Sequence, residues 1–220
     1  MTSAKAKIFI VDDHPLVREW LGALIKKDPD LTVSGEAEDA ASALKLISKN
    51  PPDLAIIDLS LGGTSGIELI QSIRAAHPKV LMIVLSMHDE QVYAERCIRA
   101  GARGYVMKRE TATNVIHAIH EVLGGNLYLS KTMTALLVQK LVSDDSAHGA
   151  TPIAQLSDRE LQVFKLLGQG NDVNGIAKML DVNLKTVHTY CARIKEKIKV
   201  GTTPELLLEA RRWHGELPVG

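Results

Sequence analysis

The sequence predicts an α/β fold, a doubly wound sheet of five parallel strands, followed by a smaller all-α domain of four helices. Two observations carry this prediction. Residues 7–123 alternate five strand patterns with five amphipathic helical patterns, and parallel neighbours need such crossover connections. After a small, polar stretch at residues 143–152, the pattern changes to helices only. We therefore expect two domains joined by a linker.

The strands are recognised mainly as short apolar runs, which suit strands covered on both faces. We expect them at residues 7–11, 31–37, 54–57, 80–86 and 104–108. We expect helices at residues 16–27, 40–48, 65–76, 91–100, 111–123 and 130–142. In the first helix, one apolar face is predicted to be buried. This face comprises Leu16, Trp20, Leu21, Leu24 and Ile25.

The C-terminal helices begin at typical capping residues. A capping-box pattern at Ser157 and Glu160 opens the first helix, Asn183 can cap the third, and Thr203-Pro204 opens the fourth. We place the first domain at residues 1–127, the connecting helix and linker at 128–152, and the second domain at 153–220.

The composition is that of an ordinary globular protein, with 45% hydrophobic and 24% charged residues and a formal net charge of zero. This balance predicts no global attraction to nucleic acid or membranes. The N-terminus has no apolar signal core and no apolar run reaches membrane-spanning length, so we expect a cytoplasmic protein without a membrane partner. Cys97 and Cys191 are expected to be reduced, structural thiols.

Carboxylates follow two strands that are neighbours in a sheet of order 2-1-3-4-5. Asp12 and Asp13 end the first strand, and Asp58 ends the third. The C-terminal ends of such strands share the crevice in which doubly wound sheets bind ligands. Asp58 alone is equally well interpreted as a cap for the turn that follows. Three crowded carboxylates, however, favour a divalent cation, and Mg²⁺ prefers oxygen ligands.

Polar side chains also end the fourth and fifth strands. Ser86 supplies a hydroxyl group and Lys108 supplies an ammonium group. Each strand that reaches the crevice thus ends in a group suited to a phosphoryl group. The alternative is that each of these polar residues is an unrelated turn residue, and this would have to be true at every one of these positions.

In order and spacing, these residues resemble the receiver domain of two-component response regulators, a flavodoxin-like fold, over about residues 5–125. The resemblance implies that Asp58 accepts a phosphoryl group from a sensor histidine kinase, and that Ser86 and Lys108 contact this group. Tyr105 matches the aromatic residue that rearranges with Ser86. The implied Mg²⁺ ligands are Asp13, Asp58 and the backbone carbonyl of Ser60, with Asp12 acting through water.

The chain departs from the receiver pattern at Leu61-Gly62, where Met-Pro is common, and at Arg109, which replaces a proline expected to follow a cis bond. An alternative is a Mg²⁺-dependent phosphatase, but those enzymes have a carboxylate two residues after the nucleophile, where this chain has Ser60. We therefore expect a phosphoacceptor with slow autodephosphorylation and no enzyme. A flavodoxin-like cofactor carrier is a further alternative, and it fails because this chain has no phosphate-binding loop after Val11.

The third C-terminal helix is basic, with five Lys and Arg residues against Glu196 within residues 185–199. Such a stripe can neutralise phosphates or can simply be solvated. Helical spacing buries Val187, Cys191, Ile194 and Ile198. The residues left exposed together are Lys185, His188, Thr189, Ala192 and Arg193. A short turn before this helix is typical of a helix-turn-helix, whose second helix enters the major groove; a plain dimerisation module is the alternative.

Leu156-Ser157-Asp158-Arg159-Glu160, Lys185-Thr186-Val187 and residues 193–198 resemble the LuxR-type DNA-binding domain of NarL/FixJ regulators over about residues 153–215. The resemblance implies a homodimer, formed on phosphorylation, that binds inverted repeats in double-stranded DNA. It implies that His188, Thr189 and Ala192 face the DNA bases and that Lys185, Thr186 and Arg193 reach the DNA backbone. Ala192 stands where a long polar residue is common. DNA binding that is independent of phosphate stays an alternative.

Overall fold

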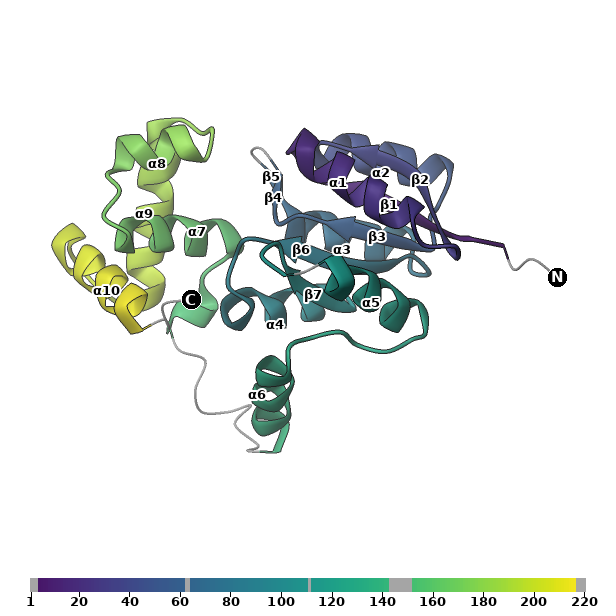
Figure 1. Ribbon diagram of the computed structural model, residues 1–220. Helices are drawn as coiled ribbons and strands as arrows, with labels where there is room; N and C mark the ends of the chain where they lie inside the picture. Colours follow the sequence, from purple (N-terminus) through teal and green to yellow (C-terminus); the bar gives the residue numbers. More distant parts are fainter. Residues whose placement is uncertain (1–3, 62–63, 111, 143–151, 217–220) are drawn as a thin grey trace. The chain divides into compact units, whose positions relative to one another are not determined.

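The structure, a computed structural model, describes residues 4–61, 64–110, 112–142 and 152–216. The chain divides into two compact units between residues 143 and 144. The first unit contains a sheet with the helices that cover it, and the second consists of helices (Figure 1). Within the described residues, none of the helices combines the length and the apolar character needed to cross a membrane.

Five parallel strands form the main sheet in the order β2-β1-β3-β6-β7, which confirms the predicted doubly wound arrangement. The strands are β1 (Ala6–Val11), β2 (Leu31–Ala37), β3 (Leu54–Ile57), β6 (Leu81–Ser86) and β7 (Gly104–Met107). Val11 lies beside Ile57, and Ile57 lies beside Val84. The C-terminal ends of β1, β3 and β6 therefore meet at one edge of the sheet.

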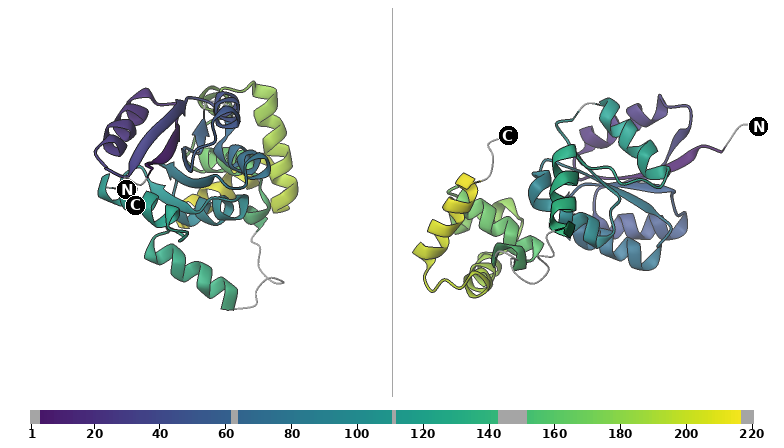
Figure 2. Two further views of the ribbon diagram at one scale, coloured as in Figure 1. Left: turned by 90° about the vertical axis from the view of Figure 1, so that its right-hand side faces the viewer. Right: turned by 90° about the horizontal axis from the view of Figure 1, so that it is seen from below.

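Helices cover both faces of this sheet, as Figure 2 shows from below. They are α1 (Pro15–Lys26), α2 (Ala40–Lys49), α3 (Gly66–Ala76), α4 (Glu90–Ala100) and α5 (Ala112–Leu123). Because successive strand residues point to opposite faces, Ile8 and Ile10 pack on one side with Leu21 of α1 and Ile119 of α5. The packing of α2 against α3 and of α3 against α4 covers the other side.

The buried stripe of α1 differs from the predicted one. Leu21 and Ile25 are buried, but Leu16 is 78% exposed and Trp20 is 39% exposed, so the prediction is wrong for these two residues. The inward row contains the partly buried Val17 and the buried Leu21 and Ile25, and it lies one residue over from the row that contains Leu16 and Trp20. Apolar periodicity predicts a broad face but not which of two adjacent rows meets the sheet.

A small antiparallel pair, β4 (Ser60–Leu61) and β5 (Thr64–Ser65), follows β3 where we predicted a turn. Strands of two residues are too short to leave a periodic signal. Gly62, at which the chain departs from the receiver pattern, lies outside the described residues. At the start of α3, a Cβ atom on Gly66 would overlap the backbone carbonyl of Asp58. Glycine therefore allows α3 to approach the end of β3 closely.

The segment that follows α5 is tied to the first unit. The amide of Tyr105 donates to the carbonyl of Tyr128 at 2.9 Å, which extends the edge of the sheet. The amide of Ser130 donates to the carboxylate of Glu90, the first residue of α4, at 2.8 Å. Helix α6 (Lys131–Val142) then packs on α4 through the buried Met133.

The described residues of the second unit form helices joined by short turns. Its elements are η1 (Pro152–Gln155), α7 (Asp158–Gly168), α8 (Val173–Met179), α9 (Leu184–Ile198) and α10 (Thr203–Glu216). The predicted capping box is present, because the Ser157 hydroxyl accepts from the Glu160 amide and the Glu160 carboxylate accepts from the Ser157 amide. Phe164 of α7 and Val187 and Ile194 of α9 form part of the buried core.

Candidate functional site

Carboxylates from two neighbouring strand ends lie together at the C-terminal edge of the sheet. Asp12 follows β1, and Asp58 follows β3 with its amide donating to the carbonyl of Val11 at 2.9 Å. Asp12 is 1% exposed and Asp58 is 3% exposed, whereas Asp13 is partly exposed. Two buried carboxylates at one place require a compensating cation, since an unpaired buried charge is costly.

Lys108 supplies that charge in this structure. Its Nζ atom lies 2.7 Å from Asp12 Oδ2 and 2.7 Å from Asp58 Oδ2, and its side chain is 10% exposed. The Lys108 amide donates to the carbonyl of Ser86 at 2.8 Å, which fixes the residue just beyond β7. All peptide bonds of the described residues are trans, including the bond from Lys108 to Arg109. One ammonium group thus bridges both carboxylates.

The electrostatics of this cluster follow from burial. Burial raises the pKa of Asp58 above its ordinary value, the ammonium group of Lys108 opposes this rise, and the nearby Asp12 adds to it. For Lys108, burial alone would lower the pKa, but the carboxylates of Asp58 and Asp12 raise it overall. A carboxylate held in this desolvated position interacts strongly with any charge that reaches it.

His14, which was not among the predicted site residues, also belongs to this cluster. Its Nδ1 atom lies 2.6 Å from Asp13 Oδ1 and 3.3 Å from Asp12 Oδ1. One ligand atom from each of Asp12, Asp13, His14 and Asp58 lies within 4.8 Å of the others. The position of His14 directly after the two aspartates is the signal that could have identified it. The carboxylate oxygens fit a hard cation such as Mg²⁺.

Ser86 and Tyr105, both fully buried, are joined through His88. The hydroxyl of Ser86 accepts from the His88 amide at 3.2 Å, and the hydroxyl of Tyr105 donates to the His88 carbonyl at 2.8 Å. Burial raises the pKa of the Tyr105 phenol, so it stays protonated. The ring of His88 also reaches back, with Nε2 lying 3.0 Å from the hydroxyl of Ser60. His88 was not predicted as a site residue, because no sequence motif marks a contact between residues so far apart.

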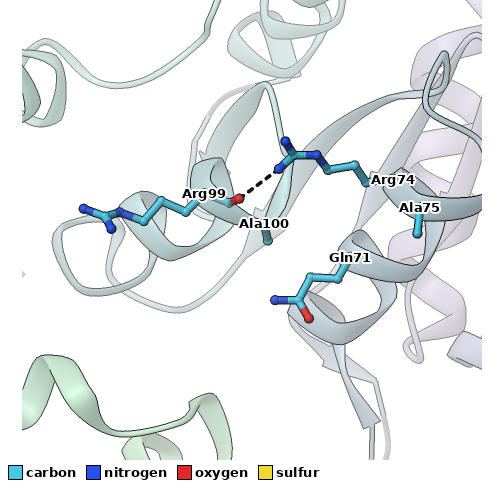
Figure 3. Close-up of a pocket in the computed structure, with 5 residues that line it drawn as sticks. All are labelled: Gln71, Arg74, Ala75, Arg99 and Ala100. Atoms are coloured by element: carbon cyan, nitrogen blue, oxygen red, sulfur yellow. Dashed lines mark hydrogen bonds between the residues drawn. The ribbon is translucent and has the colours of Figure 1, made fainter.

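A separate hollow of about 360 Å³ lies between α3 and α4 (Figure 3). In Figure 3 the guanidinium group of Arg74 donates to the backbone carbonyl of Arg99 at 3.0 Å, while the guanidinium group of Arg99 points away. Gln71, Ala75 and Ala100 complete the lining. The hollow contains none of the predicted site residues and no nucleophile.

In the second unit, α8 and α9 form a helix-turn-helix arrangement. Asp181, in the turn, has a positive φ of 49°. The side chain of Asn183 caps α9 as predicted, accepting from the amide of Thr186 at 2.8 Å. Val187 and Ile194 face the core. The opposite face is exposed at all the residues predicted for it, Lys185, His188, Thr189, Ala192 and Arg193, whereas Thr186 is half-buried.

The basic stripe is shorter than the sequence indicated. The Nζ atom of Lys197 lies 2.6 Å from Glu160 Oε2, and Glu160 of α7 is buried. Although burial opposes it, this ion pair and the capping-box hydrogen bonds lower the pKa of Glu160. Lys197 therefore holds α9 to α7, because helix packing directs its side chain inward.

Two protein families match this chain. The response regulator receiver domain matches residues 8–120. The bacterial regulatory proteins of the luxR family match residues 154–210. Together these matches cover both compact units.

Individual proteins resemble the chain over most of its length. A putative transcriptional regulator of Pseudomonas aeruginosa is 34% identical over 94% of this chain and 98% of its own length. The oxygen regulatory protein NreC of Staphylococcus carnosus is 32% identical over 91% of this chain and 94% of its own length.

Solved structures resemble the chain as well. A LuxR-family two-component response regulator from Aurantimonas sp. SI85-9A1 is 34% identical, with a TM-score of 0.59, and covers 63% of this chain and 99% of its own. A structure of two RcsB dimers bound to two parallel DNAs is 25% identical, with a TM-score of 0.57, and covers 94% of this chain and 98% of its own.

Proposed function

Because this chain belongs to the response regulators that join a receiver domain to a LuxR-family DNA-binding domain, we propose that Asp58 is its phosphoacceptor and that a sensor histidine kinase is the donor. The observation that carries the proposal is the position of Asp58, buried at the end of β3 and bridged by Lys108 to Asp12. We assign residues 1–127 to the receiver domain, 128–152 to the connection and 153–220 to the DNA-binding domain.

In the transfer step, a carboxylate oxygen of Asp58 attacks the phosphorus of a phosphohistidine in the kinase. The bond between phosphorus and the imidazole nitrogen breaks, and its electron pair stays on that nitrogen while an acyl phosphate forms on Asp58. The ammonium group of Lys108 already lies 2.7 Å from Asp58 and balances the charge that arrives. The hydroxyl of Ser86 donates to the bound phosphoryl group. Prearranged charges of this kind provide most of the catalysis in phosphoryl transfer.

The donor set fits Mg²⁺, since oxygen atoms of three aspartates gather within one small volume. We propose that Asp13, Asp58 and the backbone carbonyl of Ser60 hold the ion and that Asp12 does so through water. When bound, Mg²⁺ neutralises charge on the incoming phosphoryl group. His14, which contacts Asp13 and Asp12, orients these two carboxylates.

The bound phosphoryl group is expected to change the contacts of Ser86, whose hydroxyl accepts from His88 while Tyr105 donates to the same residue. A phosphoryl group that draws the Ser86 hydroxyl toward Asp58 pulls it away from the His88 amide. The backbone of His88 can then move, and Tyr105, which donates to the carbonyl of His88, rearranges with it. Ser60 has no acid group to assist hydrolysis and is held by His88 at 3.0 Å. We therefore expect slow autodephosphorylation.

For the output, we propose that α9 enters the major groove of double-stranded DNA. His188, Thr189 and Ala192 then face bases, and Lys185, Thr186 and Arg193 reach phosphates. The exposure of all of these residues except the half-buried Thr186 on one face of a capped helix supports this assignment. We further propose a homodimer, formed on phosphorylation, that binds inverted repeats in the cytoplasm.

Intact-mass measurement tests the phosphoacceptor. The full chain is incubated with Mg²⁺ and a small phosphodonor, beside Asp58→Asn and, as a matched control, Asp30→Asn, which changes an exposed carboxylate. We expect one added phosphoryl group in the wild type and the control and none in Asp58→Asn. An unmodified wild type, at a donor concentration that labels another receiver, would refute the proposal.

Binding to a panel of DNA sequences tests α9. His188→Ala or Thr189→Ala should change the preferred DNA sequence. Lys185→Ala should instead weaken binding to all sequences and reduce the salt dependence of the affinity. Equal losses on every probe in all three variants would remove the assignment of α9 as the recognition helix.

A further inference from the structure

The exposed face of α9 contains two parallel rows of side chains. Leu184, His188 and Ala192, spaced four residues apart, form the central row, and Lys185 and Arg193 lie in the row beside it. Leu184, the first residue of α9, is 42% exposed although it is a large apolar side chain. An apolar residue thus stands on each side of His188.

The two threonines of this helix use their hydroxyl hydrogens internally. The hydroxyl of Thr189 donates to the carbonyl of Lys185 at 2.9 Å, and the hydroxyl of Thr186 donates to Asn183 Oδ1 at 2.9 Å. Each hydroxyl hydrogen is therefore committed within the helix or its cap. In the central row, His188 is flanked by side chains that cannot form hydrogen bonds.

The bases differ in the major groove by their hydrogen-bond donors and acceptors and by one apolar group, the 5-methyl group of thymine. An apolar side chain cannot pair with the polar edges, and it leaves them without a partner when it excludes water. The thymine methyl group is the feature that an apolar side chain complements. Lys185 and Arg193 meanwhile supply attraction to phosphates that carries no sequence information.

We propose that Leu184 and Ala192 read thymine methyl groups on either side of the base contacted by His188; this rests on the proposed entry of α9 into the major groove. Eight residues of helix span about 12 Å, because each residue rises 1.5 Å. If α9 follows the groove, this span corresponds to roughly three to four base pairs at 3.4 Å each. The preferred half-site therefore contains two thymines at this separation.

Replacement of single thymines by deoxyuridine tests the proposal, because it removes the methyl group and keeps every hydrogen-bonding group. The preferred site is first selected in vitro with the phosphorylated full chain, and each thymine is then replaced in turn. We expect two positions per half-site, three to four base pairs apart, at which affinity falls about fourfold, the factor for one apolar carbon removed from water.

Variants of Leu184 assign one of the two positions to this residue. In Leu184→Ser, replacing thymine by deoxyuridine at one of the two positions should cause no further loss of affinity. Leu184→Met should remain sensitive to this replacement. Met179→Ser, which alters an exposed apolar residue of α8, is the matched control. Equal affinity for thymine and deoxyuridine at all positions, or the same loss in Leu184→Ser as in the wild type, would overturn the inference.

The two proposals fail in different ways. If a site is selected and His188→Ala changes its sequence, but deoxyuridine has no effect, then only the methyl readout is wrong. If no sequence is selected, or if no α9 variant alters the selected sequence, then the entry of α9 into the groove is wrong and the methyl readout is refuted with it.

Discussion

Lys108 holds the carboxylate cluster together, and its removal has a predictable cost. Lys108→Met leaves Asp12 and Asp58, which are 1% and 3% exposed, without the ammonium group that lies 2.7 Å from each of them. Removal of one partner from a buried ion pair costs about 3–5 kcal/mol, because an uncompensated charge remains. We expect the free energy of unfolding of the first unit to fall by this amount at pH 7.

Urea unfolding measures this loss. The chain has two tryptophans, so a Trp213→Phe background leaves Trp20 as the reporter of the first unit. Lys79→Met, which removes an exposed lysine, is the control and should change the free energy of unfolding by less than about 0.5 kcal/mol.

A second substitution and added Mg²⁺ should each partly restore the stability of the Lys108→Met variant. Asp58→Asn removes one of the two unpaired carboxylates, and Mg²⁺ replaces the lost positive charge and stabilises the state that binds it. A loss of less than about 1 kcal/mol for Lys108→Met would refute the view that this lysine balances two buried charges.

Three further perturbations test other contacts. Because the pKa of Glu160 is lowered, its ion pair with Lys197 stabilises the second unit fully at pH values above 4.5, the ordinary pKa of a glutamate. This stability is lost as the pH falls through the lowered pKa of Glu160. Lys197→Met should therefore flatten the pH dependence of urea unfolding between pH 7 and 3, followed by Trp213, and an unchanged slope would contradict this. Gly66→Ala should force the Asp58 backbone to move and abolish phosphorylation; full labelling in the mass assay would disprove the close approach. Asn183→Ala should lower the stability of the second unit by about 1 kcal/mol in urea unfolding, and a change near zero would rule out the cap.

Much of the first unit could be predicted because its sequence signals are local. The apolar run before Asp58 identifies β3, and the known order of doubly wound sheets places Asp58 beside Asp12 and opposite Lys108. Similarly, the capping residues Ser157 and Asn183 mark the starts of α7 and α9. Such features depend on a few adjacent residues, so one sequence is sufficient.

The remaining features depend on packing between distant residues. The contact of His88 with Ser60 joins residues 28 apart, and no spacing rule predicts it. The ion pair of Lys197 with the buried Glu160 follows from the way α9 crosses α7, which charge counting along one helix cannot reveal. The exposure of Trp20 depends on which row of α1 meets the sheet. Sequence patterns predict which face of a helix or strand is buried, whereas the contact partners of a side chain can be identified only from the folded structure.

The central claim is that a phosphoryl group on Asp58 changes DNA binding by the second domain. The most direct test is the affinity of the full chain for its selected site by fluorescence anisotropy, with and without phosphodonor and Mg²⁺, in the wild type and in Asp58→Asn. Coupling free energies of about 1–3 kcal/mol predict a roughly 5- to 150-fold gain for the wild type and no gain for Asp58→Asn. Equal affinities for the wild type before and after phosphorylation, with the added mass verified, would contradict the account.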